Sequence, residues 1–270
     1  MSISIAYNED CLAAMKQMPD NAFDLAVVDP PYGDGLHAED GGGKGWFTKY
    51  NQKVAEENDA ERKDTYNRFG NPGSRFEKYK PVKRIGGDGG GWKNSAYGKK
   101  IIEWDVAPEK EYFEQLFRVS KNQIIWGGNY FELPPTRCFL VWRKLSITEN
   151  FSMAMAEYAW TSFTQNAKLF DFTPQGKQND PRFHPTQKPI ELYAWIFQLF
   201  AKPGQKILDT HLGSGSSRIA AYDAGLDFVG YEIDKSYFDK QEARFNKHAQ
   251  QLNLFNVQPE PEPVQQTLIL

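Results

Sequence analysis

Residues 207–234 read ILDTHLGSGSSRIAAYDAGLDFVGYEID, and this stretch decides the fold. The apolar residues before Asp209 predict a short buried strand that leads into the glycine loop at 212–216. A helix is expected from Ser217 to Asp223, and a second strand, Phe228–Asp234, ends in acidic residues. A strand, a glycine loop, a helix and an acid-tipped strand in this order form a unit that binds adenosine-containing cofactors.

The glycine loop differs from the dinucleotide-binding fingerprint, because the third glycine is missing and the spacing that cradles phosphates is absent. A cofactor without phosphate fits better, and S-adenosylmethionine is the candidate. Gly213 and Gly215 would let the backbone approach the ligand, and the carboxylate of Glu232 can hold two ribose hydroxyls. Taken alone, the loop is better explained as a plain turn, so the interpretation depends on two further motifs.

The second motif is Asp29-Pro30-Pro31-Tyr32, which ends the apolar run 23–28. It places a carboxylate, a carbonyl and an aromatic ring at one strand terminus. The exocyclic amino group of a nucleobase becomes a nucleophile when both of its N–H bonds are held. Asp29 can accept one N–H, the Pro30 carbonyl can accept the other, and Tyr32 can stack on the base. A tight proline turn with a surface tyrosine is the alternative interpretation of these four residues.

The third motif, at 183–189, reads FHPTQKP and precedes an apolar helix expected over 190–200. Thr186 is expected to cap this helix, with Pro189 in its first turn. Lys188 is a cation near the cofactor loop and could pair with a carboxylate.

Together the motifs resemble those of the beta-class DNA amino-methyltransferases, in which the catalytic half precedes the cofactor half. The similarity spans residues 1 to about 245. It implies an α/β fold with a Rossmann-like, seven-stranded, mostly parallel sheet, a circularly permuted motif order and S-adenosylmethionine as methyl donor. Asp29 stands where cytosine N4 enzymes more often have serine, so the resemblance favours the N6 amino group of a flipped adenine.

The resemblance also assigns the site residues. Asp10 falls where the family often has Gly-Asp-Cys, and its carboxylate is expected to meet the adenine of the cofactor. His211 replaces the usual phenylalanine, and its role is open. The expected catalytic residues are Asp29, Pro30, Pro31 and Tyr32. The expected cofactor-binding residues are Asp10, Cys11, Asp29, Thr186, Lys188, Asp209, His211, Gly213, Ser214, Gly215, Ser216, Glu232 and Ile233. No metal is expected.

DNA contacts are expected from a basic, glycine-rich insertion and from a polar target-recognition region. Residues 41–100 hold 14 Lys and Arg against 7 Asp and Glu, with aromatic residues interleaved, which is typical of a phosphate-tracking segment. The alternatives are a solvated insertion and, for residues 143–183, ordinary connecting loops. The expected contacts are Arg75, Lys78, Lys80, Lys83, Arg84, Arg143, Lys144 and Arg182.

The remaining chain alternates helix and strand in the α/β manner. The N-terminal strand is expected beside the strand that leads to Glu232. Further elements are expected as a helix at 108–119 and strands at 122–128, 138–142 and 156–161. The expected regions are 1–34 with 101–142 (catalytic half), 35–100 (basic insertion), 143–183 (target recognition), 184–250 (cofactor half) and 251–270 (C-terminal tail).

Composition fits a soluble cytoplasmic enzyme, and the resemblance implies that a bacterium or a phage encodes it. The 270 residues are 40% hydrophobic and 14% aromatic, enough for one large core with an appended lobe. Cys11 and Cys138 are the only cysteines, so no disulfide framework is indicated. We expect no leader and no membrane span, because no apolar run approaches the ~20 residues required. The net charge of -3 does not by itself suggest a nucleic-acid partner.

The expected partner is double-stranded DNA, with the protein acting as a monomer or a homodimer. Residues Gln251–Phe255 resemble the peptide by which bacterial replication proteins dock on the sliding clamp. The favoured alternative is that they pack the last helix, expected to end near Gln250. Cytosine N4 methylation, methylation of RNA or of protein glutamine, and a non-catalytic DNA-binding or anti-restriction module are the functional alternatives.

Overall fold

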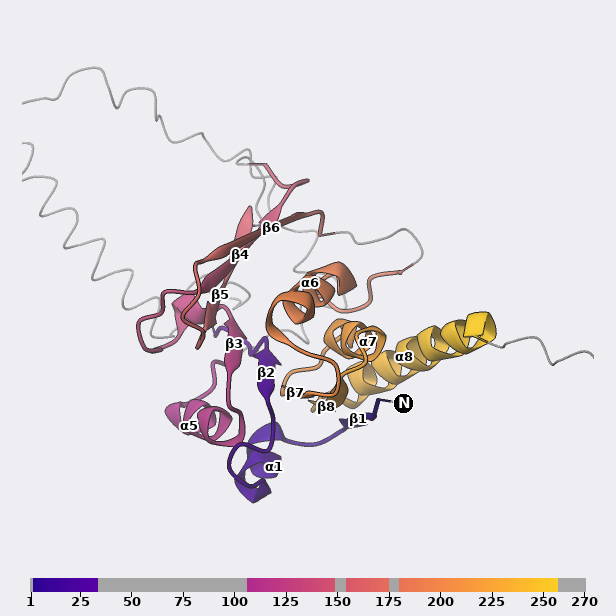
Figure 1. Cartoon of the computed structure of the whole chain (residues 1–270), viewed down its shortest axis with the longest axis horizontal. Helices are drawn as coiled ribbons and strands as arrows, with labels where there is room; N and C mark the ends of the chain where they lie inside the picture. Colours follow the sequence, from indigo (N-terminus) through magenta and orange to yellow (C-terminus); the bar gives the residue numbers. More distant parts are fainter. Residues whose placement is uncertain (1, 34–105, 149–153, 175–179, 257–270) are drawn as a thin grey trace, which may run out of the picture.

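The computed structural model describes residues 2–33, 106–148, 154–174 and 180–256, with side chains described as far as residue 251. Within these ranges, strands form one mixed sheet with helices on both faces (Figure 1). The strands are β1 (Ser4–Tyr7), β2 (Leu25–Val28), β3 (Gln123–Trp126), β4 (Phe139–Lys144), β5 (Ala156–Thr161), β6 (Lys168–Phe172), β7 (Lys206–Asp209) and β8 (Asp227–Tyr231). The helices are α1 (Cys11–Gln17), α5 (Lys110–Val119), the 3-10 turn η1 (Gly128–Tyr130), α6 (Ile190–Phe200), α7 (Ser216–Asp223) and α8 (Lys235–Asn256).

The sheet is mostly parallel, as expected, but the described residues contribute eight strands rather than seven. Their order is β1-β8-β7-β2-β3-β5-β4-β6, and the two antiparallel pairings both involve β5. The additional strand is β6, which lies inside the polar region 143–183 and pairs parallel to β4. Phe170 of β6 packs on Trp195 of α6 with ring centroids 5.0 Å apart. A strand with one apolar face packed on a helix is stable at a sheet edge, so part of the expected target-recognition region belongs to the sheet.

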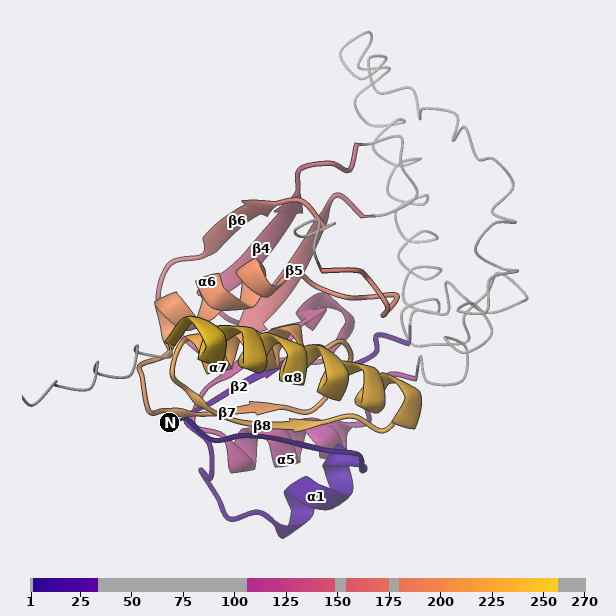
Figure 2. The same ribbon diagram turned by 90° about the vertical axis from the view of Figure 1, so that its right-hand side faces the viewer.

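The two faces of the sheet carry different helices. Helices α1 and α5 cover one face, and α6 and α7 cover the other, with α8 packed beside α7 (Figure 2). Strand β2 shows the alternation that this requires: Leu25 and Val27 join the core under α6 and α7, whereas Ala26 and Val28 join the core over α1 and α5. Central strands β2 and β3 are buried along their whole length.

The N-terminal strand lies beside the late strand β8, as the sequence predicts. β1 and β8 are parallel, with Ser4 opposite Phe228 and Tyr7 opposite Tyr231. The side-chain amide of Asn8 extends this pairing, because it donates to the carbonyls of Glu232 (2.8 Å) and Ile233 (3.1 Å). The loop before α1 therefore returns to the end of β8 although the two are more than 200 residues apart in sequence.

Helix α8 continues to Asn256, beyond its expected end near Gln250, so Gln251–Phe255 belongs to the helix rather than following it. Clamp docking by this peptide stays a prediction. The insertion at 35–100, with Arg75, Lys78, Lys80, Lys83 and Arg84, lies outside the described residues. None of the helices in the described ranges has the length and apolar character to cross a bilayer.

Candidate active site

Two of the three sequence motifs meet at the same edge of the sheet because their strands are neighbours. β2 and β7 run parallel, with Leu25 opposite Ile207 and Ala26 opposite Leu208. The turn that begins at Asp29 and the glycine loop that follows Asp209 therefore leave the sheet at adjacent carboxyl ends. An open α/β sheet collects its ligands at such a place.

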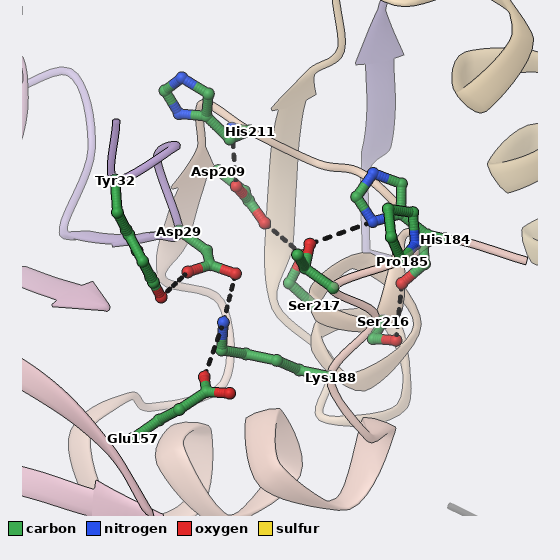
Figure 3. Close-up of polar contacts among 12 residues, drawn as sticks. Asp29, Tyr32, Glu157, His184, Pro185, Lys188, Asp209, His211, Ser216 and Ser217 are labelled. Atoms are coloured by element: carbon green, nitrogen blue, oxygen red, sulfur yellow. Dashed lines mark hydrogen bonds and ion pairs between the residues drawn. The ribbon is translucent and has the colours of Figure 1, made fainter. Parts of the chain in front are cut away.

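Asp29 is held from both sides. Its Oδ1 accepts a hydrogen bond from the Tyr32 hydroxyl at 2.8 Å, and its Oδ2 accepts from Nζ of Lys188 (Figure 3). The Lys188 side chain is only 4% exposed. Burial alone would lower the pKa of this ammonium, but Asp29 and Glu157 outweigh it and raise the pKa above its ordinary value. Lys188 is therefore a permanently charged, buried partner of Asp29.

Tyr32 is fixed by aromatic packing that the sequence analysis did not anticipate. Its ring stacks on Tyr130 with centroids 4.7 Å apart and planes 11° apart, and Phe131 meets it edge-on. Gly127, with φ +66°, lies so close that a Cβ there would be 2.1 Å from Cε1 of Tyr32. Burial and the charges of Asp29 and Glu157 hold the pKa of the Tyr32 hydroxyl well above its ordinary value, so it remains a donor to Asp29.

Asp209 is buried at the end of β7 and shapes the start of the glycine loop. Its Oδ1 accepts from the backbone N–H of His211 (3.0 Å), and its Oδ2 accepts from the Ser217 hydroxyl (2.5 Å). Burial raises the pKa of Asp209 to about 7, and the charges of Asp29 and Glu232 add to this rise. Asp29 and Asp209 follow neighbouring parallel strands, so their carboxylates lie at the same edge of the sheet.

The glycine loop needs its two glycines and closes onto Glu232. Gly213 (φ +52°) and Gly215 (φ +75°) both adopt the left-handed conformation. The Glu232 carboxylate accepts the N–H of Gly213 at 2.8 Å and the N–H of Asp234 at 2.9 Å. Burial raises the pKa of Glu232. Ile233, next to it, is 68% exposed.

The loop serines have a supporting role in this structure. Ser214 and Ser216 are buried, and their hydroxyls lie 3.1 Å apart. Arg244 of α8 donates to the Ser214 carbonyl (2.7 Å) and the Ser216 hydroxyl (3.0 Å), and its guanidinium also pairs with Asp180. One side chain therefore holds the glycine loop and the segment that leads to the third motif.

His211 belongs to a small hydrogen-bonded group. Its Nδ1 lies 2.9 Å from the Thr210 hydroxyl, which in turn lies 2.6 Å from the Tyr112 hydroxyl. Burial lowers the pKa of His211 to about 4, so the ring is neutral at pH 7. Burial likewise raises the pKa of the neighbouring Cys11 thiol to about 12, which makes it unreactive.

Asp10 caps α1, which the sequence analysis did not predict as a helix. Its Oδ1 accepts from the N–H of Leu12 at 2.7 Å and of Ala13 at 3.3 Å. Asp10 follows β1, which runs parallel to β8, so it lies at the same edge of the sheet as the glycine loop. Its charge adds to the rise in the pKa of Cys11 and opposes the fall in the pKa of His211.

The expectation that Thr186 caps α6 is wrong. The N-cap is Pro189, and it makes no side-chain capping bond. The Thr186 hydroxyl instead lies 3.2 Å from Nδ1 of His184, two residues earlier. A proline immediately before the helix holds the chain extended there, which leaves Thr186 outside the first turn.

Of the DNA contacts expected in the described residues, Lys144 does not fit. It is 6% exposed and pairs with Glu157 at 2.5 Å, so it faces the interior rather than DNA. Arg143, the residue before it, is exposed and paired with Asp171. Arg182 is exposed, and its guanidinium donates to the Pro185 carbonyl at 2.6 Å.

The chain is similar in sequence to a known family and in fold to a solved structure. A family model described as DNA methylase matches residues 93–243. The Type II methyltransferase M.HinfI of Haemophilus influenzae is 23% identical in an alignment 279 residues long. The alignment covers 88% of this chain and 67% of the relative. The putative methylase YubD of Escherichia coli K12 is 34% identical over 61 residues, 23% of this chain and 27% of the relative. The solved structure of PvuII DNA methyltransferase (cytosine-N4-specific) aligns with a TM-score of 0.51 and 11% identity, covering 94% and 92% of the two chains.

Proposed function

The chain belongs to the DNA methylase family, and we propose that it transfers the methyl group of S-adenosylmethionine to the N6 amino group of adenine in DNA. The family is S-adenosylmethionine-dependent and includes both N6 and N4 enzymes. The observation that supports the assignment is the placement of Asp29 and the glycine loop at the ends of adjacent parallel strands.

The residues around the glycine loop fit the cofactor. Gly213 and Gly215 take the left-handed conformation that shapes the loop, and each oxygen of Glu232 keeps a lone pair for a ribose hydroxyl beside the N–H group that it accepts. Exposed Ile233 offers an apolar surface to an adenine ring. When bound, S-adenosylmethionine supplies an electrophilic methyl group on a sulfonium.

Asp29 holds the acceptor base in this proposal. A base inside a duplex cannot reach a strand terminus, so the target is flipped out at a cost of a few kcal/mol. Its amino group donates one N–H to Asp29 and the other to the Pro30 carbonyl. The Tyr32 hydroxyl and Lys188 each donate to one oxygen of Asp29, so each oxygen keeps a lone pair that can accept the incoming amino group. Tyr32 then contributes its ring face, which Tyr130 supports from behind.

The reaction forms one N–C bond and breaks one S–C bond, whose electron pair stays on sulfur. Positive charge moves to the attacking nitrogen, and the carboxylate of Asp29 stabilises it. The amino proton is then lost to Asp29 and from there to solvent. Lys188 keeps Asp29 oriented throughout, because it is buried and has no freedom to turn away.

The choice of adenine rests on Asp29 as the first residue of the four-residue motif, and cytosine N4 is the alternative acceptor. We retain Arg143, Arg182 and the segment 35–100 as proposed DNA contacts, and we withdraw Lys144 because it is buried.

The test uses purified protein, tritium-labelled S-adenosylmethionine and unmethylated plasmid DNA, followed by nucleoside analysis. The proposal requires label in N6-methyladenine and none with Asp29→Ala. Label in N4-methylcytosine would keep the family chemistry but change the base. No transfer to DNA, with transfer to RNA or protein instead, would reject the proposed substrate.

A further inference from the structure

Four charged side chains form a continuous line that ends at the catalytic turn. Nζ of Lys144 lies 2.5 Å from Oε1 of Glu157, and Oε2 of Glu157 lies 3.2 Å from Nζ of Lys188. Lys188 also contacts Asp29, and Figure 3 shows it lying between the two carboxylates. The signs alternate along the line, and all four side chains are less than a quarter exposed. We call these four residues the charge line.

The topology of the sheet explains how Glu157 reaches this place. β5 runs antiparallel to β3 and β4, so it begins at the edge where its neighbours end. Glu157 is the second residue of β5, and Lys144 is the last residue of β4. The antiparallel strand therefore carries an acid from its amino end to the carboxyl-end edge of the parallel strands.

The two positive and two negative charges of the line cancel. Glu157 is the second carboxylate, besides Asp29, that neutralises the charge of Lys188. Burial alone would raise the pKa of Glu157, but Lys188 and Lys144 outweigh it and lower the pKa, so Glu157 is ionised. Without Glu157, the two buried lysines would face Asp29 as the single carboxylate of the line. An uncompensated buried cation interacts strongly with any charge nearby.

We propose that Glu157 is a positioning residue for methyl transfer, which shares the charge of Lys188 with Asp29 so that the net potential beside Asp29 is not positive towards a cationic donor. The inference rests on the proposed function, and its mechanism is electrostatic. Removing Glu157 leaves one excess positive charge beside the place where the sulfonium binds and where the attacking nitrogen becomes positive. Lys144 is the matching residue whose removal restores neutrality.

The main test is a double-mutant cycle on Glu157→Gln and Lys144→Gln, read as the single-turnover rate of methyl transfer to DNA. We expect Glu157→Gln to slow transfer at least tenfold and the double variant to recover at least fivefold of that loss. A merely structural role would also let the second substitution recover part of the loss, because it removes the lysine left without a partner, but the melting temperature would then recover in step with the rate. Melting temperatures of all four proteins are therefore measured, and a rate that only follows the folded fraction would overturn the inference.

A second readout requires neither DNA nor chemistry. Calorimetric affinities are measured for S-adenosylmethionine, whose sulfonium is positive, and for S-adenosylhomocysteine, whose sulfur is neutral. Glu157→Gln is expected to weaken binding of S-adenosylmethionine about threefold or more relative to binding of S-adenosylhomocysteine. Adding Lys144→Gln to the same chain is expected to restore the wild-type ratio of the two affinities. Loss of packing would weaken both ligands equally.

The matched control is Glu242→Gln, which breaks the Arg218–Glu242 pair between α7 and α8. The side chains of Arg218 and Glu242 are 5% and 30% exposed, close to the 4% and 23% of Lys188 and Glu157. It is expected to lower thermal stability by a similar amount without changing the transfer rate. Wild-type transfer in Glu157→Gln, or a double variant no faster than that single variant, would overturn the inference alone. Wild-type protein that binds no S-adenosylmethionine would overturn the proposed function, and the inference with it.

Discussion

Gly127 offers the sharpest test of the geometry at the catalytic turn. It follows β3 with φ +66°, and a Cβ built on it would lie 2.1 Å from Cε1 and 2.6 Å from Cζ of Tyr32. Ordinary contact begins near 3.4 Å, so in Gly127→Ala the Tyr32 ring must move by about 1.3 Å. The hydroxyl of that ring is bonded to Asp29, so the displacement reaches the catalytic carboxylate.

The expected effect on activity is large because displacements of about 1 Å at a reacting centre cost on the order of 100-fold in rate. We therefore expect Gly127→Ala to reduce the single-turnover transfer rate about 100-fold. Its backbone strain, about 1–2 kcal/mol for a left-handed alanine, should lower the melting temperature by several degrees. Affinity for S-adenosylmethionine should change by less than about twofold, because Gly127 follows β3 and the glycine loop follows β7, with β2 between these strands.

Gly225 provides a closely matched control. Its φ is +67°, and nothing lies within 4 Å of the position that a Cβ would take. Gly225→Ala therefore introduces the same backbone strain without the collision. Tritium transfer to DNA and thermal melting are measured for both variants side by side. Equal activity of the two, after allowing for the folded fraction, would refute the conclusion that Tyr32 is held in place for catalysis.

Three further predictions concern the cofactor loop and the hydroxyl of the catalytic turn. Burial raises the folded-state pKa of Asp209 to about 7, so the contribution of its protonated form to the free energy of unfolding is complete below pH 4 and is lost as pH rises through 7. In thermal melts without cofactor, Asp209→Asn should be as stable as wild type near pH 4. At pH 8 it should be more stable, by at most about 4 kcal/mol. A pH-independent difference would contradict the assigned burial. Arg244→Met, which removes the bonds to Ser214 and Ser216, should weaken S-adenosylmethionine about tenfold by calorimetry and leave the KM for DNA unchanged; an unchanged cofactor affinity would show that the loop holds its shape alone. Tyr32→Phe, which keeps the ring, should slow transfer less than tenfold, whereas Tyr32→Ala should be far slower; equal losses would assign the role to the hydroxyl instead.

Much of the fold was predictable because its signals are local. The burial of β2 and β7, the glycine loop and the start of α7 follow from apolar runs and from glycines that need positive φ. The pairing of β1 with β8 follows from the permuted motif order. β6 was missed although apolar Leu169, Phe170 and Phe172 lie within a short run, because polar flanking residues suggested a loop.

The contacts of the site were harder to predict because they come from non-local topology. Asp29, Lys188 and Asp209 were identified by motif, and the structure brings the first two into direct contact. Glu157 was missed because ligand-binding residues are expected at the carboxyl ends of strands, whereas it lies at the amino end of an antiparallel one. Gly127 and Tyr130 follow β3 without any motif, and only the position of Tyr32 gives them a role.

The most direct test of the central claim separates binding from chemistry at Asp29. Asp29→Ala and wild type are compared by calorimetry with S-adenosylmethionine and by tritium transfer to unmethylated DNA. The proposed mechanism predicts cofactor affinity within about threefold of wild type and no detectable methyl transfer. Transfer that persists, or cofactor binding that disappears together with it, would contradict the assignment of Asp29 as the group that holds the acceptor base.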